Sequence, residues 1–152
     1  MSSFINSILI KKPIELVFNY VTTTDYWPIY HTMSKSVEPL IGHPLKPTDL
    51  SIIETVETLG IIQHIEWKSI ESSPPNRFVA VGSIKDLGGG KSKLTYNFTQ
   101  MDKYTIFERI FENEENSIFM KFAEKIVIDD LIDKESKDAL AKVKAILESM
   151  PC

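Results

Sequence analysis

Two hydrophobic periodicities follow one another along this chain, and their order limits the folds that it can adopt. Between residues 37 and 113, apolar and polar residues alternate in segments of about ten residues separated by turn residues, the pattern of an antiparallel meander. After the meander comes an apolar stripe with the spacing of three and four that indicates an amphipathic helix: Ala139, Leu140, Val143, Ile146 and Leu147. That stripe needs an apolar partner, and one face of the sheet supplies it.

The residues before the meander predict one strand and two short helices. Residues 3–11 mix β-branched and polar side chains, and the strand stops before Pro13, whose fixed φ suits the first turn of a helix. The helix that follows has its own apolar stripe: Ile14, Val17, Phe18 and Val21. Thr24 and Asp25 are residue types that cap helices, and we expect them to start a second short helix rich in rings: Tyr26, Trp27, Tyr30 and His31.

The meander resolves into six predicted strands, at residues 37–41, 50–58, 61–71, 77–84, 92–100 and 104–113. The clearest turns are Pro-Pro-Asn at 74–76 and Leu-Gly-Gly-Gly at 87–90, because proline cannot donate to a ladder and glycine accepts a positive φ. Beyond the acidic loop at 112–116, good helix formers take over. The β-branched residues 126–128 leave the helix start open between 117 and 130, and we expect helix from about Asp129.

Composition excludes several classes of protein. A length of 152 residues fits one domain with one core. Lys and Arg total 17 against 21 for Asp and Glu, and this balance does not favour nucleic acid as a partner. The one cysteine is Cys152, no secretory signal is evident, and no run approaches the about 20 apolar residues of a membrane span. We therefore expect a cytoplasmic protein without integral membrane association.

A long helix laid across a curved sheet cannot fill all the space beneath it, so the order of elements predicts a cavity between them. Concave, mostly apolar spaces with a few polar groups are the usual sites for small molecules. Alternation places three sets of side chains on the inward face of the sheet: Ile61, Ile65 and Trp67; Leu94, Tyr96 and Phe98; and Thr105, Phe107, Arg109 and Phe111.

Six segments in this order resemble the START and Bet v 1-like (SRPBCC) superfamily, and within it the polyketide cyclase/dehydrase and lipid transport group. They are KPIELVFNYV at 12–21, DYWPIYH at 25–31, IEW at 65–67 with SPPNRF at 73–78, LTY at 94–96, TIFER at 105–109 and ALAKVKAILE at 139–148. The resemblance covers nearly the whole chain. It implies an α+β helix-grip fold as one domain over residues 1–152: a seven-stranded curved antiparallel sheet wrapped around a long C-terminal helix, with two short helices between strands 1 and 2.

The resemblance also implies a hydrophobic ligand between the sheet and the last helix, but it supplies no catalytic motif to carry over. In that fold the short helix with Trp27 borders the cavity mouth. With the inward-facing residues, this gives the candidate ligand-binding set: Trp27, Tyr30, His31, Trp67, Tyr96, Phe98, Phe107 and Arg109. The alternative for each aromatic residue is that it fills the core.

Arg109 is the most informative candidate, because Phe107 and Phe111 on the same face draw it inward and a buried guanidinium needs an anionic partner. Glu54 is one candidate partner, and the carboxylate or phosphate of a ligand is the other. The opposite parity, with Ile106 and Ile110 inside and Arg109 in solvent, stays open because apolar residues alternate poorly in this strand.

The leading hypothesis is a protein that binds or transports a hydrophobic small molecule, either lipid or polyketide-like. No cofactor is expected, and the three histidines show no metal-ligand spacing: His31, His43 and His64. One alternative is an enzyme of the polyketide cyclase or dehydratase type, in which Tyr30, His31, Tyr96 or Arg109 polarises a carbonyl, although no catalytic residue is identified. Another is a protein interaction module that uses the acidic loop at 112–115 or a sheet edge.

Overall fold

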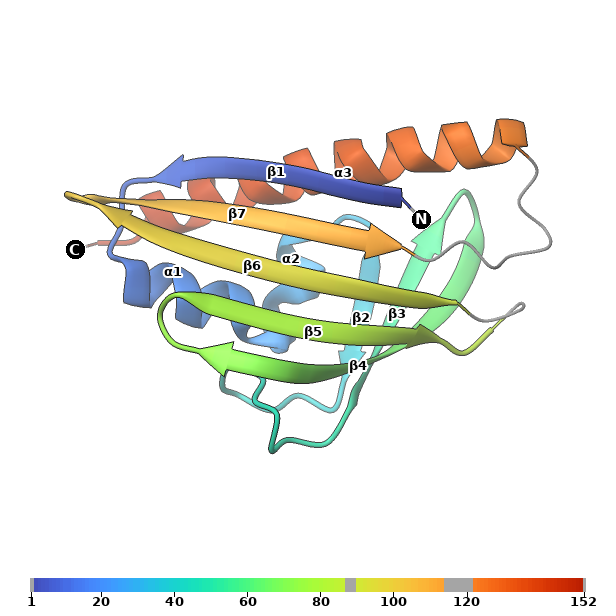
Figure 1. Ribbon diagram of the computed structural model, residues 1–152, viewed down its shortest axis with the longest axis horizontal. Coiled ribbons are helices and arrows are strands. Elements are labelled where there is room, and N and C mark those ends of the chain that lie inside the picture. The colour runs from blue at the N-terminus through green and yellow to red at the C-terminus, as the bar shows by residue number, and fades with distance from the viewer. Residues whose placement is uncertain (1, 87–89, 114–121, 152) are drawn as a thin grey trace.

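The computed structural model describes residues 2–86, 90–113 and 122–151. Within them, seven strands form one antiparallel sheet in the order β1-β7-β6-β5-β4-β3-β2 (Figure 1). The strands are β1 (Ser2–Ile10), β2 (Ser34–Glu38), β3 (Ile52–Thr58), β4 (Ile61–Ser73), β5 (Arg77–Ile84), β6 (Lys91–Met101) and β7 (Tyr104–Asn113). Each strand after β2 pairs with the strand before it, and β1 closes the order beside β7. The predicted meander is therefore confirmed.

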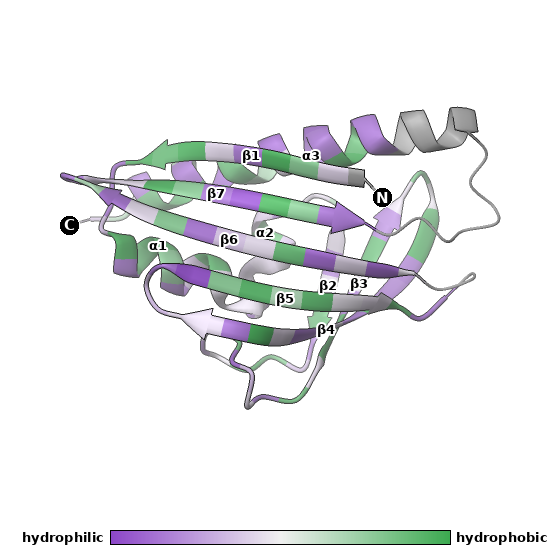
Figure 2. Cartoon of the chain, viewed as in Figure 1, coloured by the Kyte–Doolittle hydropathy of each residue, from purple (hydrophilic) through white to green (hydrophobic). Residues whose placement is uncertain are grey.

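Helices cover one face of this sheet. They are α1 (Ile14–Thr22), the short 3-10 helix η1 (Thr24–Tyr26), α2 (Trp27–Tyr30) and α3 (Phe122–Glu148). In Figure 1 these helices lie behind the sheet, and α3 runs alongside β1. Figure 2 shows hydrophilic and hydrophobic bands following one another along α3, β6 and β7, as expected for elements with one buried side. Among the residues described, no helix is both long enough and apolar enough to cross a membrane.

The apolar stripes of the two longer helices pack where the sequence predicts. The stripe of α1 is fully or almost fully buried, and so are the α3 residues Ala139, Leu140, Val143 and Leu147, whereas Ile146 of the predicted stripe is half-buried. They share one core with the inward residues of β4 to β7. In the middle of this core the rings of Phe98 and Phe107 stack in parallel with centroids 5.1 Å apart, and Tyr96 meets Phe107 edge-on at 4.9 Å.

A glycine brings β5 close to the aromatic wall of the sheet's inner face. A Cβ at Gly82 would lie 2.8 Å from Cγ2 of Ile65 and 2.9 Å from a ring carbon of Trp67. Real Cβ atoms do not approach that closely, so any side chain at position 82 would displace Ile65 or Trp67. The position therefore helps to fix the indole that borders the cavity described below.

The structure corrects several predicted boundaries. β2 covers Ser34–Glu38 rather than 37–41, because Pro39 cannot donate to the ladder and ends the strand. The long helix begins at Phe122 rather than near Asp129, since β-branched residues cost a helix only tenths of a kcal/mol each and do not outweigh its hydrogen-bond ladder. The turn at 74–76 is confirmed. Residues 87–89 of the glycine turn, residues 114–116 of the acidic loop and Cys152 lie outside the described residues.

Asp25 does not cap a helix as predicted. No side chain caps α2 or η1. The two carboxylate oxygens of Asp25 instead accept hydrogen bonds from the backbone N–H groups of Ile41 and Gly42, each at 2.9 Å. The residue therefore ties the loop after β2 to the short helices, and this partner lies too far along the chain for a local pattern to indicate it.

Candidate ligand-binding site

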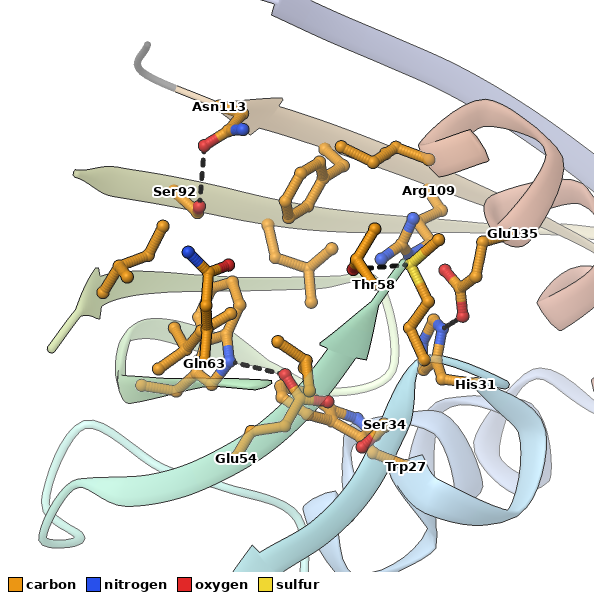
Figure 3. Close-up of a pocket in the computed structure, with 18 residues that line it drawn as sticks. Trp27, His31, Ser34, Glu54, Thr58, Gln63, Ser92, Arg109, Asn113 and Glu135 are labelled. Atoms are coloured by element: carbon orange, nitrogen blue, oxygen red, sulfur yellow. Dashed lines mark hydrogen bonds and ion pairs between the residues drawn. The ribbon is translucent and has the colours of Figure 1, made fainter. Parts of the chain in front are cut away.

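A cavity of about 120 Å³ lies between the sheet, the end of α2 and the middle of α3 (Figure 3). Side chains from β2 to β7 form most of its wall. The cavity is lined by Trp27, His31, Met33, Ser34, Glu54, Val56, Thr58, Gln63, Ile65, Trp67, Ile84, Ser92, Leu94, Arg109, Phe111, Asn113, Ile132 and Glu135. The predicted space between the sheet and the last helix is therefore present.

The residues that line the cavity differ in burial, and this difference distinguishes its deep end from its opening. The residues of the deep end are almost completely buried: Trp27, His31, Ser34, Glu54, Ile65, Trp67, Ser92, Leu94, Arg109 and Glu135. Those around the opening are half-buried: Met33, Val56, Thr58, Gln63, Phe111, Asn113 and Ile132. The ionisable lining side chains thus all lie in the deep end, beside apolar and neutral polar ones, whereas the half-buried residues are all apolar or neutral polar.

Arg109 lies inward on β7 with 7% of its surface exposed, so the interpretation that placed it in solvent is wrong. One guanidinium nitrogen donates to the hydroxyl of Ser136 on α3, and the guanidinium carbon lies 5.3 Å from the centre of the Phe111 ring. Its Nε is buried without a hydrogen-bond partner. Among the described residues no carboxylate forms an ion pair with Arg109, and Glu54 is not its partner.

His31 and Glu135 form a buried pair at the same end of the cavity. His31 caps the C-terminus of α2, and its Nδ1 lies 2.8 Å from Oε1 of Glu135 on α3. Burial alone would raise the pKa of Glu135, but His31, and Arg109 more weakly, outweigh it and hold that pKa below its ordinary value. Glu135 is therefore an ionised carboxylate that joins the end of α2 to α3 on one side of the cavity (Figure 3).

The pKa of Glu54 is shifted in the opposite direction to that of Glu135. It points into the cavity from β3, and its Oε1 accepts a hydrogen bond of 3.0 Å from the indole N–H of Trp67. Burial raises the pKa of Glu54, and the nearby His31, Ser34 and Trp67 offset this rise only in part. The protonated form is therefore favoured here more than in water.

No model of a known protein family matches the sequence, and no curated protein matches it. Solved structures do resemble it. The protein TTHA0849 from Thermus thermophilus has a TM-score of 0.75 at 12% identity, covering 98% of this chain and 100% of its own. A START superfamily protein from Mycobacterium smegmatis has a TM-score of 0.66 at 12% identity, covering 95% and 98%.

Two further solved structures also resemble the chain. Ara h 8.0201 has a TM-score of 0.66 at 12% identity, covering 98% of this chain and 99% of its own. The chain has the START/Bet v 1-like fold. The di-domain ARO/CYC protein BexL has a TM-score of 0.70 at 15% identity. The match covers 99% of this chain, which spans about half (51%) of the BexL chain. The predicted α+β helix-grip architecture is thus confirmed, and at these identities the likeness concerns the fold alone.

The predicted site residues fall into two groups, those that border the cavity and those that pack in the core. Trp27, His31, Trp67 and Arg109 border the cavity. The other four predicted residues pack in the core instead: Tyr30, Tyr96, Phe98 and Phe107. The Tyr30 hydroxyl donates to the backbone oxygen of Val21 at 2.9 Å. Burial raises the pKa of Tyr96, and the neighbouring Arg109 offsets this rise in part.

Sequence reasoning missed the contribution of α3 to this site. Glu135 lies four residues before the buried Ala139, and Ser136 lies four before the buried Leu140. Both polar residues are therefore in phase with the apolar stripe, on the buried side of the helix. A polar residue in phase with an apolar stripe is the signal that would have identified them. In the part of the chain that the structure describes, no group of three side chains is arranged to hold a metal ion.

The raised pKa of Glu54 predicts how a glutamine variant should behave. Because the folded state holds this proton more tightly than the unfolded state, Glu54 favours folding below its ordinary pKa of 4.5, and this contribution is lost as the pH rises through the folded-state value. Glu54→Gln keeps the acceptor for Trp67 and removes the ionisation. The variant should therefore gain stability relative to the parent as the pH rises from 4 to 8, measured by urea unfolding at each pH. A difference that does not change with pH would contradict this assignment.

Proposed function

We propose that the protein binds a small amphipathic molecule in this cavity, with an anionic group of the ligand held by Arg109. The proposal refines the broader expectation of a hydrophobic small-molecule ligand. The observation that carries it is a buried guanidinium that borders the cavity, has no ion pair with a described carboxylate and leaves Nε without a partner. A guanidinium stays charged at every physiological pH, so burial is costly unless an anion compensates it.

The distribution of polarity indicates how such a ligand is oriented. The deep end holds Arg109 and the other ionisable groups, whereas half-buried apolar side chains lie nearer the opening: Val56, Ile84, Phe111 and Ile132. A ligand that matches both parts enters with its anionic group first and leaves its apolar part between the sheet and α3. Arg109 then binds the anion through charge-assisted hydrogen bonds in a site largely shielded from water.

The cavity volume limits the size of the enclosed part. A volume of about 120 Å³ is close to that of an engineered cavity of about 150 Å³ that binds benzene, and below the about 300 to 1,000 Å³ of pockets for drug-sized ligands. One ring or a short chain fits inside, and anything longer extends past the opening. A long poly-β-keto chain has little room, so binding is preferred here to a cyclase reaction on such a chain.

Benzoate and benzyl alcohol test the role of Arg109, because they share a ring of the right size and differ in charge. We expect benzoate to bind more tightly in an NMR titration. Arg109→Met should weaken benzoate binding by about 10- to 100-fold, the equivalent of one or two charge-assisted hydrogen bonds, and leave benzyl alcohol nearly unchanged.

Lys93→Met is the matched control, since it removes the same charge from an exposed position on β6. It should change the binding of neither compound. Equal binding of benzoate to the parent and to Arg109→Met would show that the proposed anion site is wrong.

A further inference from the structure

Three titratable side chains from three separate elements line the deep end of the cavity together with Arg109. His31 comes from the end of α2, Glu54 from β3 and Glu135 from α3 (Figure 3). Binding an anion requires only the guanidinium, so these three groups have no role in the function proposed above. Buried ionisable groups are costly to keep, and their concentration at one end of a ligand-sized cavity needs an explanation of its own.

The pair of His31 and Glu135 has the geometry of an oriented base. Glu135 is ionised and can only accept hydrogen bonds, so the imidazole Nδ1 that faces it at 2.8 Å carries a proton. In a neutral imidazole the other nitrogen, Nε2, then has the free lone pair. Within the described residues Nε2 has no hydrogen-bond partner, and the ring borders the cavity. Glu135 thus acts as a positioning residue that fixes the tautomer in which Nε2 can accept a proton.

Glu54 provides the complementary group, an acid. One of its oxygens accepts a hydrogen bond from the indole N–H of Trp67, the hydroxyl of Ser34 lies beside the carboxyl group, and the protonated form has one O–H to donate. Burial raises the pKa of Glu54, whereas His31 and Arg109 hold that of Glu135 low. Two carboxyl groups whose surroundings separate their pKa values in this way are characteristic of sites that hold one carboxyl as an acid and the other as an ion.

We propose that the cavity catalyses keto–enol proton transfer in a small 2-oxo carboxylic acid, with His31 as general base and Glu54 as general acid. This inference rests on the proposed function, because Arg109 holds the carboxylate of the substrate. A 2-oxo acid has its ketone directly beside its carboxylate, so one bound molecule presents an anion to Arg109 and both a carbonyl oxygen and an acidic C–H bond to the neighbouring groups.

The reaction needs no other reactant. His31 Nε2 takes a proton from the carbon beyond the ketone, and the C–H electron pair forms the new C=C bond. The carbonyl π electrons take the proton of Glu54, which gives the enol, an imidazolium and a carboxylate. In the reverse step Glu54 regains a proton from the enol hydroxyl, and His31 returns a proton to carbon. Exchange of the imidazolium proton with solvent before that return places a solvent hydrogen on the carbon.

Phenylpyruvate in D₂O makes this step visible, because ¹H NMR follows the loss of its exchangeable CH₂ signal. We expect the protein to accelerate exchange above the rate in buffer alone, and 3-phenylpropanoate, which has the ring and carboxylate but no ketone, to inhibit it competitively. His31→Gln and Glu54→Gln should each slow the protein-dependent exchange by about 100-fold or more while binding 3-phenylpropanoate within about threefold of the parent. Lys93→Met should exchange normally.

The outcomes separate the two proposals. Binding of 3-phenylpropanoate without any accelerated exchange of phenylpyruvate overturns the catalytic inference and leaves the binding function standing. Absence of binding to the parent protein overturns both. Exchange that persists in His31→Gln shows that His31 is not the base.

A measurement on the parent protein tests the role of Glu135 without any variant. In the neutral form of the His31 ring, the ¹⁵N NMR shifts should show a protonated Nδ1 and an unprotonated Nε2, since a structural contact alone does not require that tautomer. The reverse tautomer in the neutral ring overturns the assignment of His31 as a base.

Discussion

Replacing Phe107 with alanine is expected to lower the free energy of unfolding by about 3 to 5 kcal/mol, the usual cost of removing a buried aromatic ring. Phe107 is 1% exposed, stacks on Phe98 and receives the edge of Tyr96. Its removal leaves a space that rigid aromatic neighbours cannot close by small movements. Urea unfolding monitored by circular dichroism measures the loss, with the midpoint shifted and the slope unchanged.

Ile5→Ala is the matched control for this variant. Ile5 lies on β1, which pairs with β7, but it is 63% exposed. Its truncation should change the free energy of unfolding by no more than about 0.5 kcal/mol. A loss below about 1 kcal/mol for Phe107→Ala would mean that the ring cluster is not the centre of the core.

Glu135→Ala should cost about 3 kcal/mol or more, because breaking a buried pair strands the remaining partner. The side chains of His31 and Glu135 are only 7% and 8% exposed, and their contact joins α2 to α3. Without the carboxylate, the imidazole N–H loses its acceptor and the two helices lose the hydrogen bond between them. We expect the backbone amides of α3 near this position to exchange hydrogen faster in the variant, and urea unfolding to report the loss of stability.

Asp138→Ala, which removes an exposed carboxylate from the same helix, is the control and should stay within about 0.5 kcal/mol of the parent. A double variant, His31→Leu with Glu135→Leu, should recover much of the stability, because two apolar side chains leave no unpaired polar group. Similar losses in Glu135→Ala and Asp138→Ala would show that the buried pair does not stabilise the fold.

The amino-acid sequence determined the order of the elements, because the hydrophobic period is a property of neighbouring residues. The change of period after Asn113 separates the meander from the last helix, and the turn at 74–76 follows from its prolines. The same alternation correctly placed Tyr96, Phe98 and Phe107 on the inner face. Boundaries were less well determined. The start of α3 differs from the prediction because helix propensities differ by only tenths of a kcal/mol per residue, and the predicted β2 ran through Pro39, which ends the strand.

Only the tertiary structure decided which inward residues border a cavity and which fill the core. Trp67 and Phe107 are both buried on the inner face, yet Trp67 borders open space and Phe107 lies within a packed ring cluster. The partnership of His31 with Glu135 likewise joins residues 104 positions apart. Periodicity indicates the side of the sheet to which a residue points. The distance between the sheet and α3 depends on how all seven strands curve together. That distance determines where side chains from the two layers meet and where they leave a cavity.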